Sequence, residues 1–581
     1  MLDSSERTQI LTSLVQRNCL QQPRIMCVDE LRKLTTRKLE AAVEGKVIID
    51  GKEVTLCVGI NDRFPLSLPL VFLQPPDALG LIPHLEEDGY LCYLDSEGLL
   101  LDSSRPVEIL VEAIERSIVL LQAGVRGDNQ WDFMDEFGVY WQKLTSPETS
   151  LPAFISADDI LRQVITYKEG KSYTLVADSI DTVHAYFNNK GKDLNSLTRH
   201  TALYVPLESG TLLVPPHRDR PWNRADIQAI VRQHLSGENL KRLKHHRNRK
   251  GKNEELIILG LPRPKGGKTL IGLIFSDIIS GHPLVTGNSY DVPLPIRIDR
   301  YDSAYLLARG GSDTRLSSTR VLVVGCGSVG SNVVVDLVQA GITRLTLVDP
   351  DLFMRENIFR HVLGRKSVSK SKVVALKEEI ESKYPYLFIT AHETYIEKAI
   401  EKEIIKLSDF DLVIFATGNH TVELYLNRLI HQQKDRPIAI FTWLEPYSIG
   451  GHALLTRPNQ RGCLQCLFTP GSPNDLNYYN QASFAASGQS FAKNDLGCNS
   501  SYVSYGALDA RKTAEQATRL ALNALKADEL GNPVLSWKGA DNLFINEGFK
   551  TSSRYQLTAD RLHETKYDYI NPICPICGEQ N

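Results

Sequence analysis

The sequence predicts a multidomain α/β protein whose C-terminal half is built around a parallel sheet. Residues 321–324 (VLVV) have the composition of a strand that is buried on both faces. Gly325, Gly327 and Gly330 follow in a G-x-G-x-x-G turn, and Asp349 closes a second apolar stretch. A strand, a glycine turn, a helix and a second strand that ends in a carboxylate form the pattern of a Rossmann-like unit.

The three glycines and the aspartate each have a role in binding a nucleotide. The glycines let the turn bend tightly and bring backbone N–H groups close to phosphate at the start of the next helix. A carboxylate in the place of Asp349 can bind ribose hydroxyls. Alone, this pattern is typical of nicotinamide and flavin enzymes.

Polar side chains in the stretch after Asp349 favour a different chemistry. Asp351, Asn357, Arg360 and Lys372 follow within one short segment. An enzyme that breaks ATP between its α- and β-phosphates needs such cationic and amide donors, because the transition state spreads negative charge over phosphate oxygens. A dehydrogenase does not need them. We therefore expect ATP to be the nucleotide, with these residues and the three glycines in its site.

Length and composition limit the class of protein. A chain of 581 residues should form three or four domains of roughly 150 residues each. The hydrophobic content of 42% and charged content of 23% are those of a globular protein. A net charge of −3 argues against general binding to nucleic acid or a membrane surface. The polar N-terminus lacks the apolar stretch of a secretion signal, so we expect a cytoplasmic protein.

Two pairs of cysteines predict a metal site. The chain has ten cysteines, and without a secretion signal we expect them to bind metal, catalyse or pack rather than form disulfides. Cys463 and Cys466 form one CxxC pair, and Cys574 and Cys577 form another. Four thiolates close a tetrahedral Zn²⁺ site, and a site with four protein ligands is structural. We expect zinc there to fasten the C-terminus onto the preceding domain.

Cys498 is a candidate nucleophile. It lies between the two pairs, in a polar loop directly before a long helical pattern. A thiolate near a helix N-terminus is stabilised and therefore reactive at neutral pH.

The segment around these residues resembles a known family. DPDLFMRENIFRH (349–361), followed by VSKSKVVALK (368–377), resembles the adenylation core of ubiquitin-activating enzymes and of bacterial sulfur-carrier adenylyltransferases. The resemblance implies a ThiF/MoeB-type adenylation domain over residues 301–581, with ATP, Mg²⁺ and zinc as cofactors and Cys498 as the thioester-forming cysteine. One position departs from the family, because Gly418 stands where an aspartate usually holds magnesium. Asp349 and Asp351 are the alternative ligands.

Residues 1–145 resemble ubiquitin-conjugating enzymes. A strand meander leads into the proline-rich segment RFPLSLPLVFLQPPD, then to Pro83-His84 and to Cys92, which precedes a helix that begins at Pro106. Pro83-His84 stands where the family has a His-Pro-Asn motif, and the asparagine has no counterpart. The resemblance implies an α+β domain in which Cys92 accepts an acyl group.

The order of the domains resembles fused enzymes of CBASS antiphage operons. Residues 150–300 carry no motif, and we expect an α+β linker or docking domain there. The resemblance implies that the chain adenylates the C-terminal carboxylate of a partner protein, such as a cGAS-like nucleotidyltransferase. The acyl group would pass from Cys498 to Cys92 and then to a lysine amine. It also implies a homodimer.

Three other functions stay open on the sequence. A sulfur-carrier adenylyltransferase with an appended binding domain would not need Cys92. A nucleotide-binding scaffold, suggested by Gly418, would bind ATP without releasing pyrophosphate. A dehydrogenase is the remaining alternative, although nothing resembles a substrate domain for hydride transfer.

Overall fold

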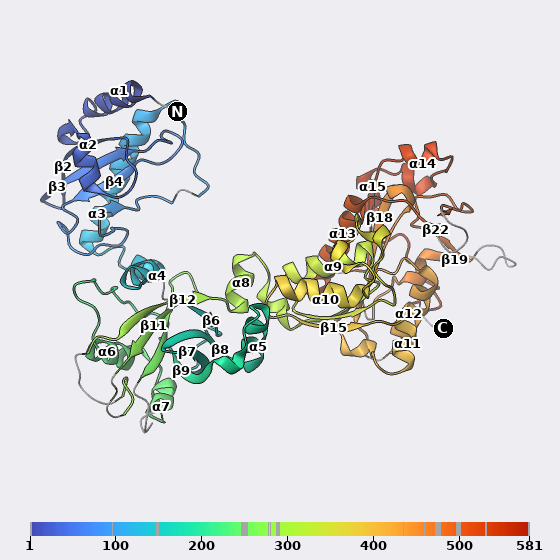
Figure 1. Cartoon of the computed structure of the whole chain (residues 1–581). Coiled ribbons are helices and arrows are strands. Elements are labelled where there is room, and N and C mark those ends of the chain that lie inside the picture. Colours follow the sequence, from blue (N-terminus) through green and yellow to red (C-terminus); the bar gives the residue numbers. More distant parts are fainter. Residues whose placement is uncertain are drawn as a thin grey trace. The chain divides into compact units, whose positions relative to one another are not determined.

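The computed structural model divides the chain into two compact units, Met1–Tyr301 and Asp302–Asn581 (Figure 1). The structure describes residues 3–95, 97–146, 150–245, 254–276, 278, 281–285, 291–433, 435–457, 459–470, 478–494, 501–528 and 531–578. Each unit has hydrophobic clusters of its own, and each is described by itself.

The first unit begins with a five-stranded antiparallel sheet in the order β1-β2-β3-β4-β5. Its strands are β1 (Gln21–Ile25), β2 (Ala41–Ile49), β3 (Lys52–Ile60), β4 (Leu70–Gln74) and β5 (Tyr90–Leu91). The helices of this part are α1 (Ser4–Val15), α2 (Val28–Leu34), α3 (Pro106–Arg126) and α4 (Asp132–Leu144). Apolar side chains of the sheet pack against α1 and α3 in one cluster, which explains the α+β character expected for this part of the chain.

The chain between β4 and β5 brings His84 next to Cys92. Leu85 and Leu91 form an isolated antiparallel bridge, and the Cys92 N–H donates to the His84 carbonyl at 2.9 Å. His84 has a φ of 65°, in the left-handed region that histidine enters more readily than most residues. This pairing fixes two segments of the chain side by side directly after β5.

Helix α4 has one face packed against the barrel and one polar face. Met134, Phe137 and Trp141 are buried in a cluster with residues of the following barrel. The Trp141 Nε1–H donates to the carbonyl of Ile296 at 3.0 Å, which ties the helix to β12 (Leu294–Arg300). Asp132 and other polar residues on the rest of the helix reach the His84 loop. The helix therefore joins the loop beside Cys92 to the barrel.

Residues 150–300 form a closed seven-stranded barrel in the order β10-β11-β12-β6-β8-β7-β9. Besides β12, its strands are β6 (Ser150–Phe154), β7 (Arg162–Glu169), β8 (Ser172–Ala177), β9 (Thr198–Pro206), β10 (Glu255–Pro262) and β11 (Lys268–Phe275). Its helices are α5 (Ile180–Asn189), α6 (Arg224–His234) and α7 (Gly237–His245). In the closed barrel each of the seven strands has a neighbouring strand on both sides.

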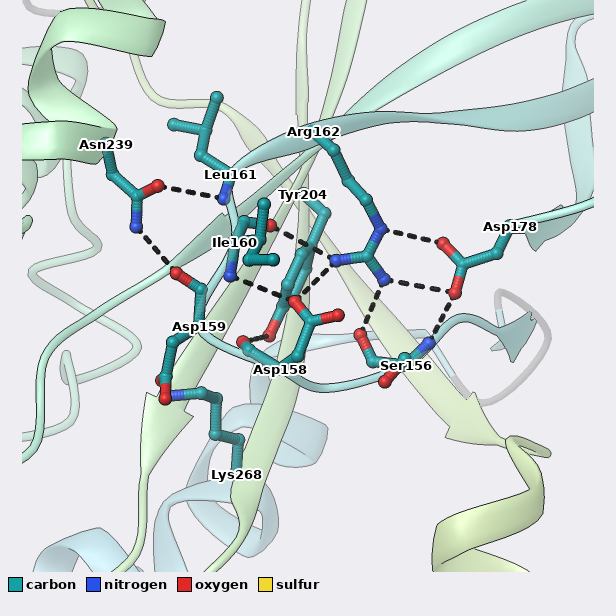
Figure 2. Close-up of polar contacts among 10 residues, drawn as sticks. All are labelled: Ser156, Asp158, Asp159, Ile160, Leu161, Arg162, Asp178, Tyr204, Asn239 and Lys268. Atoms are coloured by element: carbon teal, nitrogen blue, oxygen red, sulfur yellow. Dashed lines mark hydrogen bonds and ion pairs between the residues drawn. The ribbon is translucent and has the colours of Figure 1, made fainter. Parts of the chain in front are cut away.

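The polar loop between β6 and β7 is tied down by Arg162 (Figure 2). The guanidinium donates to Asp178 at 2.9 Å, to Asp158 at 2.7 Å and to the Ser156 carbonyl at 2.7 Å. It also lies over the Tyr204 ring, 4.8 Å from its centroid. These contacts join the loop to β8 and β9, so we assign this cluster a structural role.

The second unit is a seven-stranded sheet in the order β15-β14-β13-β16-β17-β18-β23. Its strands are β13 (Arg320–Val324), β14 (Arg344–Val348), β15 (Phe388–His392), β16 (Leu412–Phe415), β17 (Ile438–Leu444), β18 (Gly450–Thr456) and β23 (Val534–Lys538). The first five in this order are parallel, β18 pairs antiparallel with β17, and β23 pairs antiparallel with β18. The chain leaves β13 toward β14 and later returns to β16 on the other side. The carboxyl end of β13 is therefore the switch point where open α/β sheets bind ligands.

The helices of the second unit are α8 (Ser303–Arg309), α9 (Ser328–Gln339), α10 (Lys372–Lys383), α11 (Ile396–Glu401), α12 (His420–Gln432), α13 (Ala507–Leu525), α14 (Asn542–Asn546) and α15 (Ala559–Glu564). Short strand pairs are formed by β19 (Phe468–Pro470) with β20 (Tyr478–Asn480) and by β21 (Lys493–Asn494) with β22 (Ser501–Tyr502). Helix α13 packs against α9 and β18 and shares one core with them. The mixed α/β architecture predicted for this half is confirmed.

Candidate functional site

The glycine turn forms an open cradle at the N-terminus of α9. Gly325 has a φ of 85°, and a side chain there would approach the Ala416 carbonyl oxygen at 2.7 Å. A Cβ at Gly330 would collide with the Gly325 carbonyl. Gly327 is the N-cap of α9, and no described atom lies within 4 Å of the place where its Cβ would be. The space before the helix N-terminus is therefore open to an anion such as phosphate.

Asp349 holds the cradle in shape. One carboxylate oxygen accepts the Cys326 N–H at 2.7 Å, and the other accepts the Asp351 N–H at 2.8 Å. Burial raises the pKa of the Asp349 carboxyl above its usual range, while the Lys372 ammonium opposes that shift. The ribose-binding role predicted for Asp349 stays a prediction, and the structure adds this bracing of the glycine turn.

Lys372 brings a positive charge to the same place. Its side chain is largely buried at the start of α10, with Nζ 2.7 Å from an Asp351 oxygen and 4.0 Å from Asp349. The side chain of Asp351 is mostly exposed on its other side. A buried ammonium beside an open cradle favours phosphate oxygens.

The Tyr505 side chain links Arg360 to the first turn of α9. Its guanidinium lies 4.9 Å from the centroid of the Tyr505 ring. The Tyr505 hydroxyl donates to the Ser328 hydroxyl at 3.2 Å. The buried Nε of Arg360 has no hydrogen-bond partner within the described part of the chain, which fits a donor that awaits a ligand. Asn357 accepts the Met354 N–H through its side-chain oxygen at 3.0 Å.

Helix α12 carries a buried carboxylate, Glu423, that the sequence did not predict and that holds the loop after β16. Gly418 has a φ of 65°, and its neighbour Thr417 donates through its hydroxyl to Glu423 at 2.7 Å. His420 Nδ1 lies 3.0 Å from the other oxygen of Glu423. Both oxygens of this fully buried carboxylate are therefore engaged in holding the loop. Asp351 remains the more exposed carboxylate beside the cradle.

The two cysteine pairs meet in one cluster. The four Sγ atoms of Cys463, Cys466, Cys574 and Cys577 lie within 4.8 Å of one another. The Cys463–Cys574 and Cys466–Cys577 sulfur separations are 3.8 and 3.4 Å. Tetrahedral zinc with bonds of about 2.3 Å to sulfur places its ligands about 3.8 Å apart, so the cluster fits the metal.

Backbone and amide donors support the same cluster. The Gly462 N–H donates to Cys577 Sγ at 3.4 Å, and Asn427 Nδ2 donates to Cys463 Sγ at 3.6 Å. Such bonds stabilise thiolate ligands in the shell around a metal. The cluster joins the segment after β18 to the C-terminal segment, as the spacing predicted.

Cys92 lies in a second cluster, in the first unit. Its Sγ, a His84 ring nitrogen and a Glu136 oxygen are all within 4.8 Å of one another. His84 Nδ1 is 2.8 Å from Glu136, and His84 Nε2 is 3.1 Å from Asp132. Cys92 itself is exposed. Sequence reasoning placed His84 only as part of an incomplete motif and missed both carboxylates of α4.

Cys498 lies outside the described residues. The chain resumes at β22 and reaches α13 by way of Gly506, the N-cap of that helix. The Gly506 N–H donates to the Ser448 hydroxyl at 3.0 Å, and the Tyr447 N–H donates to the Ser504 carbonyl at 2.8 Å. The thioester-forming role of Cys498 stays a prediction.

Two known families match this chain, one in each half. Residues 301–573 match the ThiF family, and residues 21–148 match Prokaryotic E2 family B. The predicted combination of the two domains in one chain is confirmed. Within the described residues, no helix is both long and apolar enough to cross a membrane.

The chain is also similar to two proteins named Cap2. The chain is 26% identical over 421 residues to the ATP-dependent ubiquitin transferase-like protein Cap2 of Pseudomonas aeruginosa, covering 69% of this chain and 74% of that protein. It is 23% identical over 564 residues to the Cap2 protein of Escherichia coli, covering 88% and 89%. The crystal structure of E. coli MccB with MccA-N7isoASN matches 47% of this chain and 70% of that chain, at 14% identity and a TM-score of 0.33.

Proposed function

We propose that this protein uses ATP to activate the C-terminal carboxylate of a partner protein and then transfers the acyl group to an amine. The observation that carries the proposal is the open cradle at α9, with the Lys372 ammonium and with an Arg360 Nε that has no partner among the described residues. The match to Prokaryotic E2 family B around Cys92, and the Cap2 names of the relatives, support the later transfer.

In the first step, a carboxylate oxygen of the partner attacks the α-phosphorus of ATP. The bond to the bridging oxygen breaks, and pyrophosphate leaves with its electron pair. Lys372, Arg360 and Asn357 stabilise the negative charge that spreads over the phosphate oxygens. A carboxylate is a poor acyl donor, and linkage to AMP makes it a good one.

Mg²⁺ bound with ATP would neutralise phosphate charge. Of the two carboxylates predicted to hold it, Asp351 fits better, because both oxygens of Asp349 already accept backbone N–H groups. Zinc, when bound by the four cysteines, would be structural and would fasten the C-terminal segment.

In the later steps, the Cys498 thiolate attacks the acyl carbon and displaces AMP, which gives a thioester. The Cys92 thiolate then takes the acyl group, and a lysine amine accepts it as an amide. The transfers together divide one difficult condensation into several easier acyl exchanges, which is the benefit of covalent catalysis. We further propose a cytoplasmic homodimer in antiphage defence, with a cGAS-like nucleotidyltransferase as the activated partner.

The intact mass of the protein tests the relay. Wild type, Cys92→Ala, Cys498→Ala and the control Cys27→Ala, which removes an exposed cysteine of the first unit, are each incubated with ATP, Mg²⁺ and the protein encoded beside this one. We expect a reductant-labile adduct on Cys92 that disappears in Cys498→Ala and persists in Cys27→Ala.

Other results favour other functions. An adduct that is indifferent to Cys92 would indicate an activating enzyme of the sulfur-carrier type. Gly418, in the place of the family's magnesium aspartate, is the observation that favours a nucleotide-binding scaffold. Bound ATP without release of pyrophosphate would support the scaffold and contradict the proposal.

A further inference from the structure

The surroundings of Cys92 contain more than an acyl acceptor needs. An exposed thiol that only receives an acyl group requires access, and Cys92 has it. The structure adds the imidazole of His84 and two carboxylates, those of Asp132 and Glu136 on helix α4. His84 is separated by 48 residues from Asp132 and by 52 residues from Glu136. Groups of three kinds brought together in this way are typical of nucleophilic catalysis.

Each ring nitrogen of His84 lies close to a carboxylate, and Nε2 also has a hydrogen bond to its neighbour, Asp132. Nδ1 is 2.8 Å from Glu136 and Nε2 is 3.1 Å from Asp132. The backbone is fixed as well, because the His84 N–H donates to the Tyr140 hydroxyl at 3.1 Å and the His84 carbonyl accepts the Cys92 N–H at 2.9 Å. The ring therefore lies against α4, and the backbone of His84 is paired with that of Cys92, whose Sγ lies within 4.8 Å of a ring nitrogen.

The electrostatics of the cluster favour a charged ring. The side chain of Cys92 and then the Glu136 carboxylate raise the pKa of His84 to about 10, against the cost of partial burial. Other charges nearby are paired with one another, since Glu86 contacts Lys143 at 3.1 Å and Arg37 at 2.9 Å, and Asp88 contacts Arg37 at 3.6 Å. At neutral pH the cluster therefore presents an imidazolium beside the sulfur.

We infer that His84 is a catalytic residue of this thiol site, with Glu136 and Asp132 as the residues that position it; the inference rests on the proposed transfer through Cys92. The imidazolium pairs with the Cys92 thiolate before acylation. It thereby raises the fraction of the sulfur that is ready to attack.

The same ring serves the second half of the reaction. When the thiolate attacks the donor thioester, the bond to the donor sulfur breaks, and that sulfur takes the proton of His84. His84 is then neutral beside a neutral thioester. As the incoming amine attacks the acyl carbon, its proton passes to the ring nitrogen, the bond to the Cys92 sulfur breaks, and thiolate and imidazolium are restored.

Alkylation of the full chain tests the pairing without ATP or a partner. Iodoacetamide is added between pH 5.5 and 9.5, and the rates at Cys92 and at Cys27 are followed by peptide mass. Cys27 is an exposed thiol of the same unit and serves as the internal reference. We expect Cys92 to react at least tenfold faster than Cys27 at pH 6.5, and the two rates to converge near pH 9.5, since thiolate fraction controls the rate.

Variants of the positioning residues sharpen the test. His84→Gln should lower the rate at Cys92 roughly tenfold at pH 6.5 and little at pH 9.5. Glu136→Gln should also lower the alkylation rate of Cys92 at pH 6.5, but by less than His84→Gln does. Asp128→Asn, which alters an exposed carboxylate just before α4, should leave the profile unchanged. If the His84 variant does not fold, the alkylation profile of Glu136→Gln tests the inference in its place.

Two results would overturn the inference. The first is equal pH profiles for Cys92 and Cys27, unaffected by His84→Gln. The second is protection of Cys92 from alkylation by Zn²⁺ alone in wild type but not in Glu136→Gln, which would make the cluster a metal site. Failure of the relay would leave these profiles intact, because alkylation needs neither ATP nor partner, so the two failures are distinguishable.

Discussion

Gly327 and Gly330 stand three residues apart in one turn, and the structure assigns them different tasks. A Cβ at Gly330 would collide with the Gly325 carbonyl, whereas a Cβ at Gly327 would enter the open space before α9. We expect Gly330→Ala to lower the thermal stability of the second unit. We expect Gly327→Ala to preserve stability and to weaken ATP binding about tenfold, or about 1.4 kcal/mol. Thermal unfolding and nucleotide titration separate the two effects.

The control for this pair is Gly364→Ala. Gly364 has no described atom within 4 Å of its Cβ position, its φ is −108°, and it lies outside the cradle. It should change neither stability nor binding. Equal loss of ATP binding in Gly327→Ala and Gly364→Ala would contradict the assignment of the cradle.

Residues that are close in sequence were predictable, and residues brought together by the fold were not. The glycine turn and the two CxxC pairs have fixed local spacings, which is why the sequence alone points to them. Glu423 and the carboxylates of α4 have no such spacing. Glu423 is buried by packing of α12, and Glu136 reaches His84 only after the chain has completed α3.

At the scale of elements, helix α4 links the barrel to the thiol site. Phe137 is fully buried in the cluster that α4 shares with the barrel, while Val139 on the same helix is 54% exposed. Phe137→Ala should cost about 3–5 kcal/mol of stability, because it leaves a cavity in that cluster. Loss of docking should also carry Glu136 away from His84 and slow the alkylation of Cys92 at pH 6.5.

Val139→Ala is the matched control on the exposed face of the same helix. It should leave both the unfolding transition and the rate at Cys92 near their wild-type values. If Phe137→Ala lowers stability but leaves the alkylation rate of Cys92 unchanged, the loop holds His84 without help from α4.

The cysteine cluster gives a second prediction for an element, the C-terminal segment. Cys574 and Cys577 lie far along the chain from Cys463 and Cys466, and the metal is expected to join them. Cys466→Ser should abolish stoichiometric zinc and increase hydrogen exchange in residues 559–578. Cys57→Ser, a change at a buried cysteine of the first unit, should leave both unchanged. Full zinc content in Cys466→Ser would contradict the ligand assignment.

The barrel shows where prediction of elements stops. The apolar stretches of residues 150–300 predicted strands, but closure depends on pairs such as β12 with β6 and β10 with β9. These pairs join distant or parallel strands, for which the sequence carries no turn signal. The strand-rich character was therefore predictable from composition, whereas the barrel was not.

At the scale of the whole molecule, the chain divides into two units with separate hydrophobic cores. The cradle lies in the second unit and Cys92 in the first. We expect residues 302–581 alone to release pyrophosphate when given ATP, Mg²⁺ and the partner protein, but to form no amide. Adding residues 1–301 as a separate chain should restore amide formation.

The rate in that mixture should rise with the concentration of the added unit. Within one chain the linked units meet at an effective concentration that reaches the millimolar range, so the separated units should be slower at micromolar concentrations. Residues 1–301 with Cys92→Ala is the control and should restore nothing. Residues 302–581 do not contain Cys92. If they form the amide alone, the second unit completes the transfer by itself and Cys92 takes no part in the reaction.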